Sequence, residues 1–359
     1  MAEAFKLAWQ VKGTTFPNPA VGAIVVAGRE IVGRGATSPY GGPHAEKIAL
    51  AQAGKRAKMA ALYVTLEPCC HFGRTPPCTD AIISSGIKSV YISTMDPNPL
   101  VHGGGLHQLR KNGITVHSGL LSEEAKSINE DFFWSITRKR PWITLKLAMT
   151  LDGRIADEAG HSQWITSVGS RTFVHELRRR HAAIIVGAAT LRKDDPKLTV
   201  RFGKRANPAR IVFSSSPRLP ATSYFIKNAH KTRSIVVIAD GKEGLKKKNS
   251  KGLEIWYIGK STEEKGLESF LQTAYSEGLT SLLVEGGSAI ASLFMKHHRV
   301  NRVYLFYGNK LVGKGLDGFS FSKGLPLSQA IELQDRTVRL FSDDVLISGI
   351  PVWKNTEEQ

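Results

Sequence analysis

Short apolar runs alternate with stretches of helical periodicity along almost the whole of this 359-residue chain. In the first half, a strand-like run at 61–65 precedes a helical pattern at 78–85. In the second half, a run at 281–284 precedes a helical pattern at 289–295. This order of elements is typical of βαβ units, in which the strands are parallel. The alternation therefore predicts α/β layers with a largely parallel sheet.

The alternation starts afresh once, near the basic, proline-marked stretch Lys139-Arg140-Pro141. Because domains usually contain about 100–200 residues, we expect two of them, at 1–140 and 141–359. The predicted strands are 21–26, 61–65, 90–93, 115–117, 142–149, 183–186, 211–213, 234–238, 281–284 and 302–305. The predicted helices are 44–52, 78–85, 103–111, 171–180, 267–276 and 289–295.

The composition is that of an ordinary globular protein, with 42% hydrophobic and 22% charged residues. The sequence contains no apolar run long enough to span a membrane, and we find no secretory signal. Three cysteines in a chain of this length are not a disulfide framework. We therefore expect a cytoplasmic protein that has no membrane partner.

The net charge of +18 raises nucleic acid as a partner, and its distribution argues against one. Residues 201–260 carry 14 basic and 3 acidic side chains, including Lys246, Lys247, Lys248 and Lys251. No aromatic residues are interleaved with this lysine run, as a platform for stacking single-stranded bases would require. A solvated basic surface is the favoured interpretation, ahead of attraction for phosphorylated ligands or nucleic acid.

Four residues of the first half form a pattern with a clear chemical logic: His44 and Glu46, then Cys69, then Cys78. One imidazole and two thiolates leave a tetrahedral Zn²⁺ one open position for water, which is typical of catalytic zinc. The ion lowers the pKa of that water, and Glu46 is placed to move protons. Cys70 is expected to be an ordinary thiol, because adjacent residues rarely both bind one metal.

A His-x-Glu followed by Pro-Cys is the signature of zinc nucleobase deaminases. Here eight residues separate the two cysteines, in the stretch TLEPCCHFGRTPPC at 65–78. This stretch, PNPAVG at 17–22 and DPNP at 96–99 resemble the motifs of the bifunctional riboflavin-biosynthesis deaminase/reductase family. The resemblance implies that Asn18 binds the pyrimidine. It makes His71 and Arg74 candidates for the phosphate or ribose side of the ligand.

The second half contains neither a GxGxxG after a strand nor a P-loop. Glu285-Gly286-Gly287-Ser288 lies between a predicted strand and a predicted helix. Glycines at such a turn can expose backbone N–H groups to a phosphate, although a plain tight turn is the commoner explanation. Asp194-Asp195-Pro196 is also most often a turn.

The resemblance extends over this half, where LKLAMTLDGR at 145–154 and VHELR at 174–178 match the reductase domain of the family. It implies a cytidine-deaminase-like three-layer α/β/α domain, followed by an α/β domain similar to dihydrofolate reductase. The implied NADPH contacts are Ala148, Trp164, Thr190, Asp194, Gly287 and Ser288. The implied substrate contacts are Lys146, Ser162, Arg178, Leu198, Arg201 and Glu285, with Lys146 beside the reacting ribose.

The chain departs from the family pattern at several positions. Ile48 stands where Asn or His is usual, Arg192 and Lys193 where apolar or small residues are common, and Gly308-Asn309 where Ala-Pro is usual. The resemblance implies two successive steps of riboflavin synthesis on a small phosphorylated pyrimidine. Two alternatives stay open: a nucleic-acid deaminase, and a reductase with a non-catalytic deaminase-like scaffold domain. A homo-oligomer is compatible with the sequence.

Overall fold

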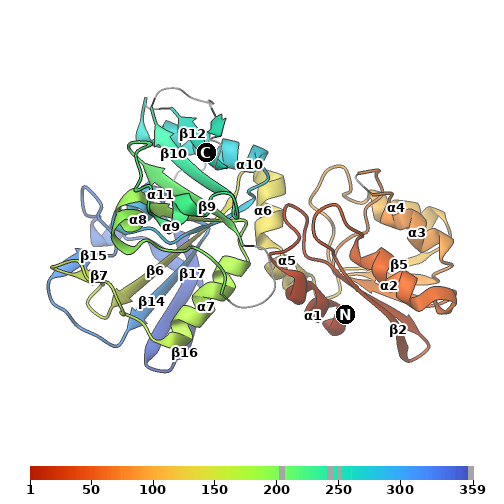
Figure 1. The fold of residues 1–359 in the computed structure, drawn as a ribbon. Coiled ribbons are helices and arrows are strands. Elements are labelled where there is room, and N and C mark those ends of the chain that lie inside the picture. The colour runs from red at the N-terminus through yellow and green to blue at the C-terminus, as the bar shows by residue number, and fades with distance from the viewer. Residues whose placement is uncertain (74, 202–206, 241–245, 249–251, 260, 355–359) are drawn as a thin grey trace. The chain divides into compact units, whose positions relative to one another are not determined.

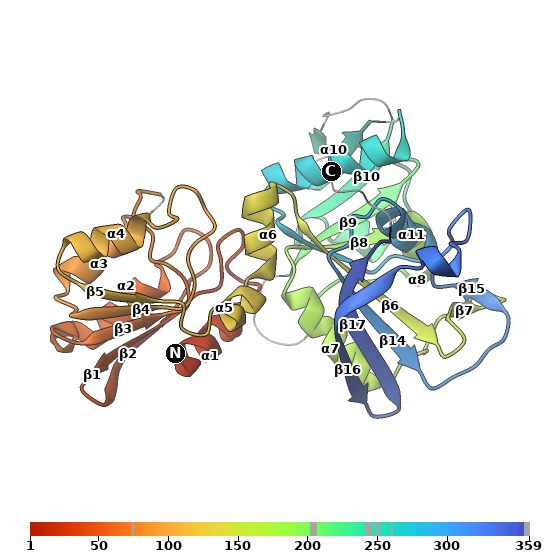
Figure 2. The same cartoon turned by 180° about the vertical axis from the view of Figure 1, so that it is seen from behind.

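The chain divides into two compact units, Met1–Arg140 and Pro141–Gln359, each described here by itself. The computed structural model (Figures 1 and 2) describes all residues except 74, 202–206, 241–245, 249–251, 260 and 355–359. Within the described part of the chain, no helix combines the length and the apolar character needed to cross a membrane.

The first unit is a five-stranded sheet with helices on both faces. Its strands are β1 (Gly22–Ala27), β2 (Glu30–Ala36), β3 (Ala61–Val64), β4 (Ser89–Ile92) and β5 (Thr115–Ser118), in the order β2-β1-β3-β4-β5. Its helices are α1 (Ala2–Val11), α2 (Ala45–Ala53), α3 (Cys78–Ser84), α4 (Gly104–Lys111), α5 (Ser122–Ile128) and α6 (Glu130–Arg138). β3, β4 and β5 are parallel, whereas β1 runs antiparallel to both β2 and β3.

Two hydrophobic clusters account for this three-layer arrangement. Leu62 and Val90 from the sheet pack with Ala49, Ile82 and Leu109 from α2, α3 and α4. A smaller cluster joins α1 to α5. The sequence therefore predicted the architecture correctly. The expectation of a largely parallel sheet was wrong for β1, which runs antiparallel to both β2 and β3 and is joined to β2 by a hairpin.

The second unit is built on a ten-stranded sheet and a two-stranded one. Its strands are β6 (Trp142–Thr150), β7 (Arg154–Asp157), β8 (Ala183–Gly187), β9 (Ala209–Ser214), β10 (Ser234–Ala239), β11 (Lys246–Lys248), β12 (Leu253–Ile258), β13 (Ser281–Val284), β14 (Arg302–Gly308), β15 (Gly315–Asp317), β16 (Glu332–Phe341) and β17 (Asp344–Val352). Its helices are α7 (Val168–Arg179), α8 (Ala188–Asp194), α9 (Tyr224–Lys227), α10 (Glu263–Ser276) and α11 (Ser288–Lys296).

The large sheet has the order β11-β12-β10-β9-β8-β13-β6-β14-β17-β16 and is parallel from β12 to β14. Hydrophobic clusters lie on both of its faces, with α10 and α11 on one and α9 on the other. Because β8, β13 and β6 are neighbouring parallel strands, their carboxyl ends lie near one another. In open α/β sheets, ligands bind at the carboxyl ends of the strands.

The predicted basic cluster is only partly described: the backbone of Lys246–Lys248 forms β11, but the side chains of these residues and the whole of Lys251 lie outside what the structure describes.

Candidate active sites

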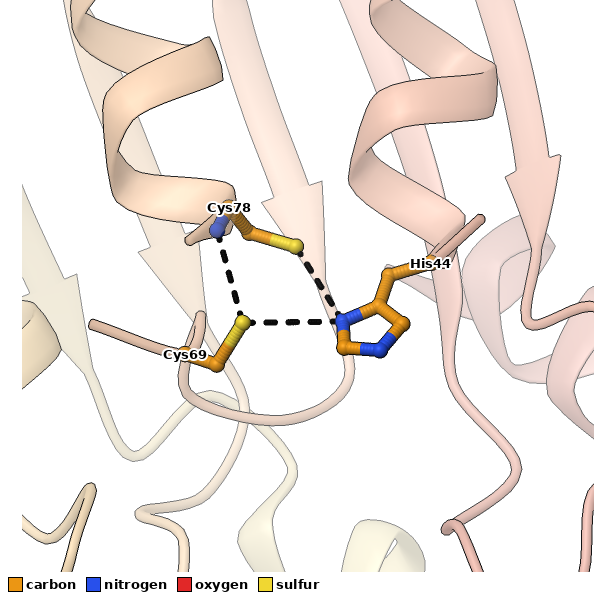
Figure 3. A group of neighbouring side chains, drawn as sticks. All are labelled: His44, Cys69 and Cys78. Atoms are coloured by element: carbon orange, nitrogen blue, oxygen red, sulfur yellow. Dashed lines mark hydrogen bonds between the residues drawn. The ribbon is translucent and has the colours of Figure 1, made fainter. Parts of the chain in front are cut away.

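His44, Cys69 and Cys78 lie together, at the starts of α2 and α3 and in the loop that follows β3 (Figure 3). The Nδ1 atom of His44 lies 3.5 Å from the Sγ of Cys69 and 3.3 Å from the Sγ of Cys78. All three ligand atoms lie within 4.8 Å of one another. One imidazole and two thiols at this spacing fit a Zn²⁺ ion that has three protein ligands and one open position.

Local structure explains how the three side chains meet. His44 is the N-cap residue of α2, and Cys78 is the first residue of α3. The backbone N–H of Cys78 donates to the carbonyl oxygen of Cys69 at 3.0 Å, which ties the two ends of the cysteine loop together. Hydrogen bonds from Cys78 and His44 lower the pKa of the Cys69 thiol, so this site favours a thiolate.

Glu46 lies in the first turn of α2 and is buried. Burial, followed by the nearby Cys69, raises the pKa of this carboxyl to about 7. A carboxyl that titrates near neutrality can both accept and donate a proton at the pH of a cell.

A cavity of about 460 Å³ opens beside the three ligands. Asn18 and His71 line it, and the Nδ1 of His71 is buried with no hydrogen-bond partner among the described residues. This unpaired polar atom is available to a ligand. Ile48, which replaces the usual Asn or His of the family, is not among the residues that line the cavity. Arg74 lies outside the described residues.

Sequence reasoning assigned no role to three carboxylate or amide side chains that also line this cavity: Glu67, Asp96 and Asn98. Burial, followed by the charges of Glu67 and Cys69, raises the pKa of Asp96 to about 6. The DPNP motif was the available signal for Asp96 and Asn98. Nothing in the local sequence shows that Glu67 reaches the same wall.

In the second unit, Arg178 of α7 and Glu285 at the end of β13 form a two-point ion pair, with N–O distances of 2.6 and 2.8 Å. Burial opposes the ionisation of Glu285, but the charge and hydrogen bonds of Arg178 outweigh it and lower the carboxyl pKa. Lys146 of β6 is close enough for Glu285 to affect its pKa. Three of the implied substrate residues thus come together from separate elements.

The glycine turn after β13 is the predicted strand-to-helix turn. Gly287 is the N-cap residue of α11, and a Cβ added there would lie 3.6 Å from the Oγ1 of Thr190. The Oγ of Ser288 is buried and has no hydrogen-bond partner among the described residues. An unpaired hydroxyl at a helix N-terminus fits a ligand with phosphate groups, such as a dinucleotide.

The other residues implied for this site are more dispersed. Trp164 is 56% exposed, and the Arg171 guanidinium lies 4.3 Å from its ring centroid. Leu198 is buried in the cluster around α9. Asp194 and Arg201 are exposed, and Ala148 and Ser162 are partly buried.

Comparison with known proteins gives matches that cover up to 98% of the chain. Residues 1–94 match the cytidine and deoxycytidylate deaminase zinc-binding region, and residues 141–347 match the RibD C-terminal domain. The riboflavin biosynthesis protein RibD of Aquifex aeolicus is 46% identical over 319 residues, 88% of each chain. The chain belongs to the RibD family. The RibD protein of Escherichia coli is 36% identical, covering 97% of each chain.

Solved RibD structures agree in fold. The diaminohydroxyphosphoribosylaminopyrimidine deaminase/5-amino-6-(5-phosphoribosylamino)uracil reductase of Thermotoga maritima is 38% identical, with a TM-score of 0.84 over 98% of this chain and 97% of its own. RibD of Acinetobacter baumannii superposes with a TM-score of 0.86 at 30% identity, over 98% of this chain and 97% of its own. This member of the family is therefore a bifunctional deaminase and reductase of riboflavin biosynthesis that uses zinc and NADPH.

Proposed function

We propose that the first unit deaminates 2,5-diamino-6-ribosylamino-4(3H)-pyrimidinone 5′-phosphate and that the second unit reduces the product. The observation that carries the first assignment is the juxtaposition of His44, Cys69 and Cys78 with buried Glu46 beside a cavity of about 460 Å³. His44, Cys69 and Cys78 would hold zinc, which when bound acidifies water and polarises the reacting centre.

Glu46 is the proton carrier of the proposed deamination. It accepts a proton from the attacking water, whose oxygen bonds to the carbon that bears the amine. It then delivers the proton to the departing nitrogen. The carbon–nitrogen bond breaks and ammonia leaves. The second hydrogen of the water moves to the neighbouring ring nitrogen, so that a carbonyl remains. Asn18, at the cavity wall, orients the pyrimidine by hydrogen bonding.

The second unit converts the ribosyl group to a ribityl chain. NADPH supplies the hydride for this step, and its phosphates would lie against the Gly287-Ser288 turn and Thr190. We assign further cofactor contacts to Ala148, Trp164 and Asp194. Lys146 donates a hydrogen bond to the reacting sugar. As the hydride adds to the sugar carbon that bears the amine, the bond from this carbon to the ring oxygen breaks, and that oxygen takes a proton from water. The remaining substrate contacts are Ser162, Arg178, Leu198, Arg201 and Glu285.

The test is to incubate the purified protein with the diaminopyrimidine ribosyl phosphate, with and without NADPH, and to identify products by mass spectrometry. Without NADPH, we expect an amine of the pyrimidine to be replaced by a carbonyl. Only with NADPH do we expect the product to gain two further hydrogens. If the zinc-loaded protein does not remove the amine of the substrate, the protein is instead a reductase with a non-catalytic scaffold domain.

The partner that this proposal requires is a small phosphorylated pyrimidine. The cytoplasmic location and the lack of a nucleic-acid partner stay predictions from the sequence. Salt-sensitive RNA binding would contradict the second of them.

A further inference from the structure

Glu67 lies between the end of β3 and the zinc ligand Cys69, and its side chain is buried. Its Oε2 accepts hydrogen bonds from the backbone N–H groups of Asp96 at 3.3 Å and Gly103 at 3.1 Å. Its Oε1 accepts one from the N–H of Leu106 at 3.1 Å. One carboxylate thus satisfies three backbone donors from the segment that follows β4.

Two of these donors belong to the N-terminus of α4. The N-cap residue of this helix is Gly103, which has no side chain with which to cap the free N–H groups. Glu67 supplies the missing acceptor from a distant part of the chain, and its negative charge also suits the positive end of the helix dipole. The carboxylate therefore replaces a local cap.

Glycines allow α4 to approach this closely. A Cβ added at Gly105 would lie 2.1 Å from the carbonyl oxygen of Pro68, and one at Gly104 would lie 2.8 Å from the Sγ of Cys70. Real Cβ atoms do not tolerate such distances. The start of α4 is thus packed directly against the segment Glu67–Cys70, which contains the zinc ligand Cys69.

The segment held in this way forms one wall of the substrate cavity. Asp96, Asn98 and Val101 line the cavity. Glu67 binds the backbone of Asp96 itself, and Asn98 and Val101 lie between Asp96 and Gly103, which Glu67 also binds. Glu46 lies in α2 and His44 is its N-cap residue, whereas the hydrogen bonds of the Glu67 carboxylate go to residues 96, 103 and 106.

We propose that Glu67 is a positioning residue of the deaminase site, whose carboxylate fixes the 96–103 wall of the cavity relative to the loop after β3 that carries Cys69. The inference rests on the proposed deaminase function. It implies that Glu67 controls substrate binding more than the chemical step, because the zinc ligands and Glu46 keep their own supports.

Glu67→Gln is the direct test, because it preserves size but leaves one acceptor oxygen for three donors and turns an NH₂ group toward N–H groups. We expect the deaminase KM to rise about tenfold or more, as loss of charge-assisted hydrogen bonds predicts, with kcat changed less than about threefold. Zinc content and reductase kcat/KM on deaminated substrate should stay unchanged. Glu124→Gln, at an exposed glutamate of the same unit, is the matched control and should alter none of these.

Hydrogen exchange gives a readout that needs no turnover. In Glu67→Gln the backbone amides of 96–106 should exchange faster, whereas those of 45–53 in α2 should not. Gly105→Ala, which pushes α4 away from Pro68, should reproduce both the KM increase and the faster exchange.

An unchanged KM together with unchanged exchange would overturn the inference. Loss of zinc, or a fall in reductase activity as large as the fall in deaminase activity, would also overturn it. If the unsubstituted protein does not deaminate, the proposed function fails, and exchange alone then decides the role of Glu67.

Discussion

Arg178 and Glu285 face each other as a two-point ion pair, with the arginine side chain 16% and the glutamate side chain 8% exposed. Arg178 comes from α7, and Glu285 follows β13 more than a hundred residues later. The guanidinium also donates to the carbonyl oxygen of Thr199 at 3.3 Å. This pair joins three segments of the proposed reductase site.

Glu285→Gln should therefore destabilise the second unit. Removing one partner of a buried ion pair leaves an uncompensated charge, which typically costs about 3–5 kcal/mol. We expect a loss of about 3 kcal/mol in the free energy of unfolding, measured by urea denaturation followed by far-UV circular dichroism, which does not depend on the reductase site. Glu176→Gln is the control, because Glu176 pairs with Arg179 on the same helix but is 40% exposed. Its loss should stay below about 1 kcal/mol. Equal losses in the two variants would contradict the interpretation.

The cysteines Cys78 and Cys70 provide a second comparison. Cys78→Ser should remove a zinc ligand, so metal content measured by elemental analysis and deaminase activity should both fall while reductase activity persists. Cys70→Ser should keep the metal, because the Sγ of Cys70 lies against the carbonyl oxygens of Leu100 and Val101 rather than within the ligand group. Loss of zinc from Cys70→Ser alone would show that the ligand set is wrong.

The sequence predicts best those elements whose pattern is local. The runs at 61–65, 183–186 and 281–284 correspond to β3, β8 and β13, because buried parallel strands are continuous apolar segments. β2 was missed because Gly33 and Gly35 break its pattern. A Cβ at either glycine would lie about 2 Å from a backbone oxygen of α2, so both glycines are explained only by tertiary packing.

In the proposed sites, too, the sequence predicts what depends on local pattern and misses what depends on tertiary packing. Motif spacing predicts the group His44, Cys69 and Cys78, because ligand chemistry restricts the residue types and the helix starts place them. The contacts of Glu67 with Gly103 and Leu106 span more than thirty residues and follow no spacing rule. They depend on how α4 packs, which a single sequence does not specify.

Lys146 should give the reductase a pH dependence of its own. Burial, with a smaller contribution from Arg178, lowers the pKa of this lysine below its ordinary value of 10.5, although Glu285 acts in the opposite direction. If the protonated amine donates to the sugar, activity is complete below the lowered pKa and is lost as pH rises through it. We expect a basic limb below pH 10.5 in the profile of reductase kcat/KM. In Lys146→Arg, which stays charged, that limb should disappear, and a limb unchanged in the variant would assign the titration to another group.

Gly308 explains how this chain accommodates Gly-Asn where the family pattern has Ala-Pro. A Cβ at Gly308 would lie 2.0 Å from the carbonyl oxygen of Ile165, and Lys310 donates to the carbonyl oxygen of Trp164. The end of β14 is thus packed against the loop that carries Trp164. Gly308→Ala should displace this loop, because the clash is with backbone that cannot rotate away.

We expect Gly308→Ala to raise the KM for NADPH several-fold, to leave deaminase kinetics unchanged and to cost about 1–3 kcal/mol of stability. Gly324→Ala is the matched control, because a Cβ there would meet nothing within 4 Å. Steady-state reductase kinetics at varied NADPH concentration separate the two variants. A KM for NADPH that is equal in both would mean that the Trp164 loop does not contact the cofactor, and the assignment of Trp164 would have to be withdrawn.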